Sequence, residues 1–385
     1  MKKILNSGCI RIFVSVALVL SSFSCMKDDN DDAKCGQEDS YIQTDITTYS
    51  LASEDKLALG AGEYVIRRCR LYAFDGDKLD NTVYFDNITS GNLGEYVARM
   101  KVTQTTTKKL YCIINEPDNA EMRSKLALIN NPAAFAQIEY TLADYVNKAY
   151  NSDATFGATD FCLPMYGETP TTFSTVTSTP ETDIPISMTV TRAVARVDVY
   201  LQTSRDIRAD AIKINSDTKF DILNTRAKGY MAPTQVPSNG LIDIENAASG
   251  PASALAIPVR NEADNAAAKR VFTFYTPERS QGAGSELGFK LKNVDFNGVK
   301  KSYTVSINAT GTNGLTKIER NKSHKLICTF AAQYMEIIFT ATVTKWDAGG
   351  INGYANVDGD GNYHGDTSVV YPWDDGGTGG DIEVN

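Results

Sequence analysis

A run of alternating side chains near the end of the chain, from Met335 to Trp346, constrains the fold most strongly. One set of alternate positions holds Ile337, Phe339, Ala341 and Val343, and the other holds Ile338, Thr340, Thr342 and Thr344. Strict alternation of β-branched residues over this length indicates a strand with one buried face. A polar cluster, Lys317–Lys325, and an apolar run, Leu326–Phe330, precede it. The sequence therefore predicts a loop, a strand, a short turn and a closing strand.

Further strands are predicted along most of the chain. Arg192–Leu201 places alternate apolar residues on one face and Arg196, Asp198 and Tyr200 on the other. Glu63–Phe74 alternates similarly, and the Asp-Gly-Asp sequence that follows it favours a hairpin turn. Comparable segments are Tyr41–Ile46, Asn81–Ile88, Tyr96–Thr105, Lys109–Asn115, Arg270–Tyr275 and Ser302–Ile307. Strands separated by turn residues predict a mainly β protein with a β-sandwich for each domain.

One stretch, Pro117–Ser152, has a helical period instead. Its apolar residues at helical spacing are Met122, Leu126, Leu128, Ile129, Phe135, Ile138, Leu142 and Val146. This spacing predicts two short helices. The Thr-rich segment Thr169–Thr182 is too polar to build a core and predicts a loop or a crossing between domains.

The N-terminus has the pattern of an export signal. Two lysines and Arg11 precede a short apolar core, Ile12–Leu20, which is too short to span a bilayer. Small residues then lead into Cys25, a pattern that resembles a lipobox and predicts lipidation at this cysteine; an ordinary signal peptide with an incidental cysteine is the alternative. The acidic run Met26–Asp32 cannot pack and predicts a tether, and it resembles a signal for the outer face of the outer membrane. Several acyl chains would anchor the chain stably, since each buried methylene contributes about 0.8 kcal/mol.

The composition fits a secreted β protein. Removing the signal peptide, with three positive charges, lowers the net charge from −9 to about −12. Such an acidic surface argues against nucleic acid as a partner, because nucleic-acid binding requires a basic stripe. The length of the mature chain predicts two domains.

Cysteine usage leaves two readings open. After loss of Cys9 and lipidation of Cys25, the remaining cysteines are Cys35, Cys69, Cys112, Cys162 and Cys328. There is no Cys-x-x-Cys pair, and an odd number prevents complete pairing. Buried free thiols are favoured, with one unlocated disulfide as the alternative.

Five short segments, taken together and in order, resemble a known family. They are Leu71–Asp77, Lys109–Asn115, Arg192–Val197, Lys317–Asn321 and Thr342–Trp346. The family is the fimbrillins, the subunits of the lipoprotein-derived type V pili of two-membraned gut and oral anaerobes. In that family a Lys-Ile-Glu-Arg-Asn run precedes the penultimate strands and a Thr-Val-x-x-Trp strand comes near the end. The resemblance covers about residues 20 to 350 and implies two β-sandwich (transthyretin-like) domains in tandem, with a short helical insertion in the first.

The resemblance also implies a route of maturation. Fimbrillins hold their first strand in the precursor until a trypsin-like protease cuts it away, and a neighbour's C-terminal strand then takes its place. Stalk subunits carry an Arg in the loop after that strand, but this chain has no Arg between Cys25 and Arg67. Lys56 lies in a suitable loop and is the candidate processing residue. Without cleavage the chain would stay anchored by lipid, as a basal or terminating subunit would.

The tail beyond Trp346 supplies the candidate donor strand. It is Gly-rich and carries spaced apolar residues, and it repeats the pattern around Trp346 at Val370–Gly377. Such a segment can add to the sheet edge of a neighbouring molecule, with alternate side chains filling pockets. The candidate residues for strand exchange are Val369, Tyr371, Trp373, Ile382 and Val384. A disordered tail, or a strand that pairs within its own domain, is the alternative.

No metal, cofactor or reaction centre is predicted. Asp358–Asp366 places oxygen-bearing side chains at alternate positions, but Tyr363 stands where an EF-hand needs Gly and the bidentate Glu is missing, which favours a plain turn. Only His324 and His364 occur, and there is no His-Glu-x-x-His, Gly-x-Ser-x-Gly or phosphate-binding loop. Carboxylates are abundant, yet no stretch singles out a glycosidase-like pair.

The sequence thus predicts a signal peptide at 1–24, a tether at 25–39, β-sandwich domains at 40–190 (helices near 117–150) and 191–347, and a tail at 348–385. The predicted function is that of a structural subunit of a cell-surface fimbria that supports adhesion, with other fimbrial subunits as partners and the outer membrane bound through lipid. The alternatives are a monomeric surface lipoprotein that binds glycan or a host ligand, and an anchor or tip subunit.

Overall fold

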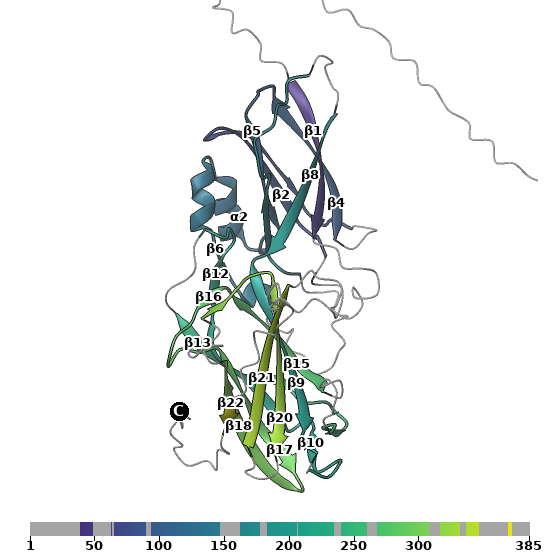
Figure 1. The fold of residues 1–385 in the computed structure, drawn as a ribbon. Helices are drawn as coiled ribbons and strands as arrows, with labels where there is room; N and C mark the ends of the chain where they lie inside the picture. The colour runs from purple at the N-terminus through teal and green to yellow at the C-terminus, as the bar shows by residue number, and fades with distance from the viewer. Residues whose placement is uncertain are drawn as a thin grey trace, which may run out of the picture. The chain divides into compact units, whose positions relative to one another are not determined.

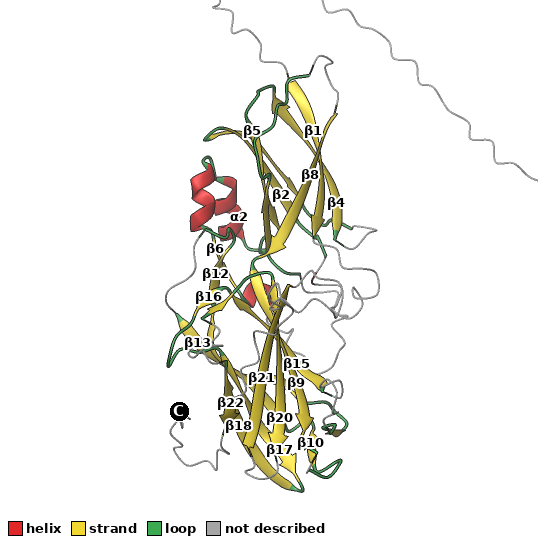
Figure 2. Cartoon of the chain, in the orientation of Figure 1, coloured by secondary structure: helices red, strands yellow, loops and turns green. Residues whose placement is uncertain are grey.

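The computed structural model describes residues 39–48, 63, 65–89, 94–146, 162–177, 183–205, 207–234, 240–259, 268–307, 316–331, 336–345 and 369–371 (Figure 1). Strands dominate these residues, and the few helices lie in the first half of the chain (Figure 2). The predicted signal peptide and almost all of the predicted tether lie outside the described residues.

The first β domain is built on one seven-stranded sheet. Its strands are β1 (Asp39–Thr48), β2 (Cys69–Asp75), β3 (Lys78–Phe85), β4 (Glu95–Thr103), β5 (Lys108–Ile114), β7 (Met165–Glu168) and β8 (Asp183–Arg192). They are ordered β3-β2-β5-β7-β8-β1-β4. The first described strand therefore lies inside the sheet, next to β8, the last strand of the domain.

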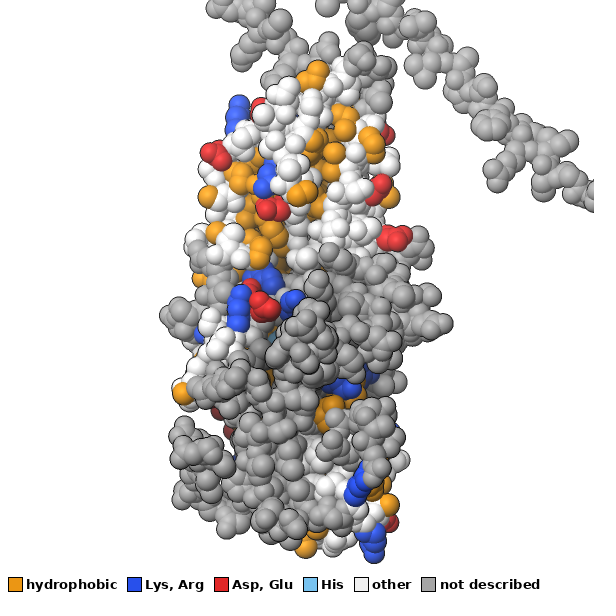
Figure 3. Space-filling view, viewed as in Figure 1, with side chains coloured by type: hydrophobic (Ala, Val, Ile, Leu, Met, Phe, Trp, Pro, Cys, Tyr) orange, Lys and Arg blue, Asp and Glu red, His pale blue; other side chains and the backbone are white. Residues whose placement is uncertain are grey.

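The two ends of this strand order meet, which folds the sheet over a single core. Asp80 of β3 accepts hydrogen bonds from the backbone N (2.9 Å) and the hydroxyl (2.8 Å) of Thr103 in β4. Asn81 donates to the carbonyl of Lys101 in β4 at 2.7 Å, and Lys108 forms a buried ion pair with Asp80. Apolar side chains also gather on the visible face of this domain (Figure 3).

A helical insertion packs against the face of β2 that carries Tyr72. It contains α2 (Ala120–Ala127), the 3₁₀ helix η2 (Pro132–Gln137), β6 (Glu139–Thr141) and α3 (Ala143–Val146). The side chain of Asn119 caps α2 by accepting from the backbone N of Met122, and the Tyr72 hydroxyl donates to the carbonyl of Leu126. The ring of Phe135 packs edge-on against Tyr72 at 5.0 Å, so the insertion belongs to the core of the first domain.

The second β domain has two larger sheets. One contains β10 (Ile212–Ile214), β11 (Lys219–Arg226), β13 (Leu241–Ser249), β14 (Leu255–Ala256), β17 (Gly288–Phe296) and β18 (Val299–Ser306). The other, ordered β15-β9-β20-β21-β22, contains β9 (Val194–Thr203), β15 (Lys269–Pro277), β20 (Lys322–Ala331), β21 (Glu336–Lys345) and β22 (Val369–Tyr371). Two small pairs, β12 (Lys228–Tyr230) with β6 and β16 (Arg279–Ser280) with β19 (Lys317–Ile318), complete the fold.

The core of the second domain lies between its two sheets. Phe220 of β11 stacks on Phe272 of β15 with ring centroids 4.8 Å apart, and Tyr303 of β18 meets Phe330 of β20 edge-on at 5.1 Å. This core begins along the chain at Ala195, directly after Val194 of the first-domain core, to which Met231, Ala232 and Tyr275 also belong. The predicted mainly β fold, with two β-rich domains and an early helical insertion, is confirmed.

One predicted strand has a different start, and the polar face of another is buried. β2 begins at Cys69 rather than Glu63, because the side chain of Asn115 binds the backbone N of Arg67 and takes this segment out of the ladder. The polar face of β9 is not left to solvent, since Arg196 and Asp198 are 0% and 6% exposed. The late start of β2 and the burial of the polar face of β9 both depend on residues far away in the sequence.

Candidate functional site

The first strand, β1, occupies a slot between β4 and β8. It pairs antiparallel with β4 from Asp39 to Thr47 and parallel with β8 from Tyr41 to Thr48. Ile42, for example, lies between Met100 of β4 and Ile184 of β8. A strand with two neighbours leaves no unpaired edge, so taking β1 out would expose the main-chain groups of both β4 and β8.

One face of β1 is buried at every second residue. These residues are Ser40, Ile42, Thr44, Ile46 and Thr48. Ile42 and Ile46 are 0% and 1% exposed and belong to the core of the first domain, where each contributes about 1.5–3 kcal/mol. Polar contacts fix the two ends, since Ser40 Oγ donates to the carbonyl of Thr175 at 2.8 Å and Thr48 N donates to the carbonyl of Gly94 at 2.7 Å.

The outward face of β1 has weaker contacts. The guanidinium of Arg99 lies 3.8 Å from the ring centre of Tyr41 and pairs with Asp183 of β8 at 2.8 Å. Lys101 pairs with Asp39 at 2.6 Å, and in both ion pairs the side chains are more than one-third exposed. Exposed pairs contribute little to stability. The ladder and the inward side chains therefore hold β1 in its slot.

The chain after β1 is anchored at Glu63. Residues 49–62, including the candidate processing residue Lys56, lie outside the described residues. The Glu63 side chain is fully buried, and Arg196 Nη1 donates to both of its carboxylate oxygens at 3.1 Å. The Tyr275 hydroxyl also donates to this carboxylate, and Arg192 Nε donates to the carbonyl of Glu63 at 3.0 Å.

Opposite charges within this cluster offset the cost of burying them. Burial raises the pKa of Glu63, and the positive charges of Arg196 and Arg192 oppose that rise. Burial lowers the pKa of Arg196, but the carboxylates of Asp198 and Glu63 outweigh it, so the net pKa is raised and the guanidinium stays charged. Asp198 accepts from Arg196 Nε at 3.0 Å and from the Thr273 hydroxyl at 2.5 Å. Residue 63 is thus tied to the second domain.

Sequence reasoning missed Glu63. The available signal was the pair of arginines in the otherwise apolar segment around β9, since a buried guanidinium needs a carboxylate partner. No spacing rule identifies that partner, because Glu63 and Arg196 are separated by most of the first domain.

The Lys317–Asn321 motif has a structural explanation. Arg320 pairs with Glu278 at 2.7 Å and donates to the carbonyl of Met231 at 2.8 Å. Asn321 adopts a left-handed conformation (φ 55°), and its backbone N donates to the carbonyl of Val194 at 2.8 Å. The motif therefore fixes the loop before β20 against the start of β9.

The candidate donor segment is described only in part. Val369 and Tyr371 lie in β22, which pairs antiparallel with residues 337–339 of β21 in the same chain. Trp373, Ile382 and Val384 lie outside the described residues. β22 is the last strand in its sheet order, with one strand partner where β1 has two. In this structure the segment thus pairs within its own domain, an alternative that the sequence left open, and strand exchange stays a prediction.

The remaining candidates contribute no reaction centre to the described part of the chain. Cys25 and Asp358–Asp366 lie outside it, and within it no cluster of three or more metal-ligating side chains occurs. Among the described helices, none has the length and apolar character needed to cross a bilayer. His324 is buried, which lowers its pKa to about 4. The closest described thiols, Cys69 and Cys112, have Sγ atoms 3.8 Å apart, so they are not joined by a disulfide.

Comparison with known proteins gives a clear result for the fold. No protein-family model and no curated protein sequence matches the chain. Among solved structures, the tip fimbrial protein Mfa3 from Porphyromonas gingivalis, with C-terminal truncation, matches with 14% identity over 80% of this chain and 100% of its own, at a TM-score of 0.53. Two proteins assigned to cell adhesion match with 16% identity over 80% of this chain. They are from Parabacteroides distasonis (97% of its own length, TM-score 0.53) and Bacteroides eggerthii (96%, TM-score 0.51).

The chain therefore has the fold of bacterial fimbrial and cell-adhesion proteins over 80% of its length. The resemblance seen in the five sequence segments is confirmed at the level of the fold. The matched proteins are described as a tip fimbrial protein and as cell-adhesion proteins, and none of these descriptions is that of an enzyme, in agreement with the prediction from sequence.

Proposed function

We propose that this chain is an exported lipoprotein that becomes a subunit of a cell-surface fimbria and assembles by strand exchange. Its partners are other fimbrial subunits, and the precursor is held at the outer membrane by lipid on Cys25. The shared fold supports the fimbrial class. The proposed exchange rests on one observation, the position of β1 in a slot between β4 and β8.

The slot suits a replacement strand from another subunit. A guest strand would regain the main-chain hydrogen bonds of β4 and β8 and would place every second side chain in the pockets that Ile42 and Ile46 fill. The tail carries Val369, Tyr371 and Trp373 at that same spacing of two residues. Since β22 is the last described strand in its sheet order, its removal from β21 would uncover only one sheet edge.

Lys56 is the favoured cut site for a trypsin-like protease. The first arginines after it, Arg67 and Arg68, have backbone carbonyls bound by Ile88 N at 2.9 Å and Asn115 N at 2.8 Å. A protease needs an extended, unpaired backbone, so these two bonds protect Arg67 and Arg68. A cut at Lys56 would free β1, while Glu63 would keep the new N-terminus tied to the second domain.

Limited trypsin digestion of the purified full-length chain tests the exchange. We expect a discrete product that begins at Leu57, identified by N-terminal mass spectrometry, followed by SDS-resistant ladders. Lys56→Gln should block both, whereas the matched variant Lys78→Gln, at the exposed first residue of β3, should leave both unchanged. Cleavage at Lys56 with a product that stays monomeric would overturn the proposal.

A second variant tests the donor. Truncation after residue 365 removes β22 and the other donor candidates but leaves β1 and Lys56 in place. We expect normal cleavage without ladders. When the truncated chain is mixed with cleaved full-length chain, its empty slot should accept the tail of one full-length chain, but it has no tail to pass on, so the polymer should end there. Ladders formed by the truncated chain would show that another segment enters the slot.

The lipid is tested separately. Mass spectrometry of the membrane-extracted precursor should show an acylated Cys25 as the first residue, and Cys25→Ser should move the chain out of the membrane fraction. An unmodified N-terminus elsewhere would remove the anchor from the proposal and leave the exchange untouched.

A further inference from the structure

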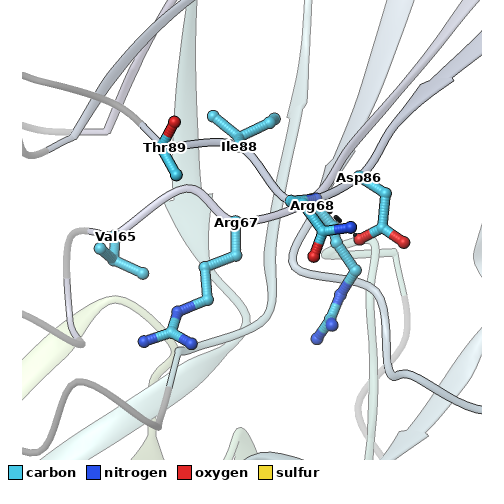
Figure 4. Close-up of a pocket in the computed structure, with 7 residues that line it drawn as sticks. Val65, Arg67, Arg68, Asp86, Ile88 and Thr89 are labelled. Atoms are coloured by element: carbon cyan, nitrogen blue, oxygen red, sulfur yellow. Dashed lines mark hydrogen bonds between the residues drawn. The ribbon is translucent and has the colours of Figure 1, made fainter.

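A surface pocket lies where the chain enters β2 and leaves β3. It has a volume of about 370 Å³ and is lined by Val65, Arg67, Arg68, Asp86, Asn87, Ile88 and Thr89 (Figure 4). The two segments are joined by one backbone bond, from Ile88 N to the carbonyl of Arg67. Beyond that bond they separate, and this separation forms the pocket.

The walls of the pocket are fixed by two asparagines in left-handed conformations. Asn115 (φ 57°) accepts from the backbone N of Arg67 at 2.9 Å and donates to the carbonyl of Val65 at 2.8 Å. Asn87 (φ 54°) turns the chain after β3, and its backbone N donates to Asp86 at 2.8 Å. The pocket is thus formed before any ligand arrives, which lowers the entropy cost of binding.

The pocket contains two positive charges that no carboxylate of the described residues pairs with. Neither Arg67 nor Arg68 forms an ion pair with a carboxylate of the described residues, and the buried Nε of Arg68 has no hydrogen-bond acceptor among them. The lining carboxylate of Asp86 already accepts from Arg123 at 3.4 Å.

The neighbouring arginine, Arg70, is satisfied by its own partner. It binds Glu116 through Nε at 2.7 Å and Nη2 at 2.8 Å. Among the described residues of this region, the positive charge without an ion-pair partner is therefore at Arg67 and Arg68, in a chain whose net charge is −9. A buried donor without an acceptor is destabilising, and an anionic ligand would recover that loss.

We propose that this pocket binds an acidic saccharide unit, with Arg67 and Arg68 holding its carboxylate or sulfate. A guanidinium presents donors in a planar fork that matches such oxyanions. Asn87 and Thr89 supply an amide and a hydroxyl for the sugar hydroxyls, and the volume suits a single sugar ring rather than an extended peptide. The site is independent of strand exchange, because none of its residues belongs to β1, β4, β8 or β22.

Calorimetric titration of the full-length chain with glucuronate tests the site. We expect a dissociation constant on the order of 1 mM or tighter, and no detectable binding of the neutral matched sugar, glucose. The Arg67→Gln, Arg68→Gln double variant should bind at least about tenfold more weakly, whereas the control Arg208→Gln, an exposed arginine of the second domain paired with Asp210, should bind normally. The charge-preserving variant Arg68→Lys should keep part of the affinity for glucuronate. Its thermal melting curve should match that of the unchanged chain, which would show that substitution at this position does not unfold the domain.

Three results would overturn the proposal. They are no binding of glucuronate, equal binding of glucose, and undiminished binding by a folded double variant. Equal binding of glutarate, a carboxylate without a sugar ring, would overturn the assignment to a saccharide.

Discussion

The first and last described strands of the chain have contrasting structural roles. β1 has ten residues, neighbours on both sides and two isoleucines in the core, whereas β22 has three residues and a single strand partner. Yet the only covalent link from β1 to the strands around it is residues 49–62. A single cut there would leave β1 held by non-covalent contacts alone. The comparison shows that a strand can be essential to a core and still be exchangeable. The following predictions test that contrast.

The largest effect is expected in β1. Ile42→Ala and Ile46→Ala should each lower the free energy of unfolding by about 2–5 kcal/mol, because both side chains are fully buried. The two positions are four residues apart in an extended strand, roughly 13 Å at about 3.3 Å per residue, so the losses should be nearly independent and the double variant should lose about their sum. Urea unfolding followed by circular dichroism measures the loss. The control Val97→Ala, at a position 57% exposed in β4, should change it little.

The anchor behind β1 comes next. Arg196→Met leaves Glu63 buried without its main counter-charge and should cost about 3–5 kcal/mol of the free energy of unfolding. Adding Glu63→Gln should restore part of that loss, since the uncompensated charge is then gone. Arg99→Gln, which breaks an exposed ion pair, is the matched control and should cost no more than about 1 kcal/mol. If Arg196→Met lowered the free energy of unfolding no more than Arg99→Gln does, the buried cluster around Glu63 would not be an anchor.

Acid should weaken the second domain through His324. Burial, with help from the charge of Lys322, lowers the pKa of His324 from its usual 6.5 to about 4. The unfolded chain therefore takes up this proton first as the pH falls through 6.5, and the free energy of unfolding should drop by on the order of 3 kcal/mol between pH 6.5 and 4. His324→Leu should remove that part of the pH dependence. An unchanged slope in the variant would contradict the assignment.

The smallest effect is expected at β22. Truncation after residue 365 removes a three-residue ladder and should cost about 1–2 kcal/mol, because each net hydrogen bond contributes about 0.5–1.5 kcal/mol. Hydrogen exchange of the β21 amides should report the exposed edge directly. A loss as large as that of the β1 variants would remove the contrast between the two strands.

Local patterns predicted the strands well. The alternation in residues 335–346 became β21, and Tyr41–Ile46 falls within β1. The helical spacing after Pro117 produced α2, whose buried residues, Met122 and Leu126, were among those identified. These features succeed because each depends on residues within one element.

Contacts between distant segments could not be predicted. The alternation in β9 predicted its polar face but not the partner of Arg196, which is Glu63 from before β2. The pocket at Arg67 and Arg68 arises because Asn115, almost fifty residues later, redirects the backbone that precedes β2. No periodicity within either segment encodes such a meeting. The candidate exchange residues rest on the spacing of apolar residues in the tail and on the family resemblance, and Cys25 and Lys56 lie outside the described residues.

The mixed pairing of β1 has one further consequence. Because one wall of its slot is antiparallel and the other parallel, a guest strand reproduces both ladders of β1 as they stand only when it runs the same way as β1. Each subunit would then receive its neighbour's tail in a single orientation. A polymer built this way is heterologous and head-to-tail, with one end that offers an open slot and another that offers a spare strand. Its two ends would be chemically different, and growth would proceed from one of them.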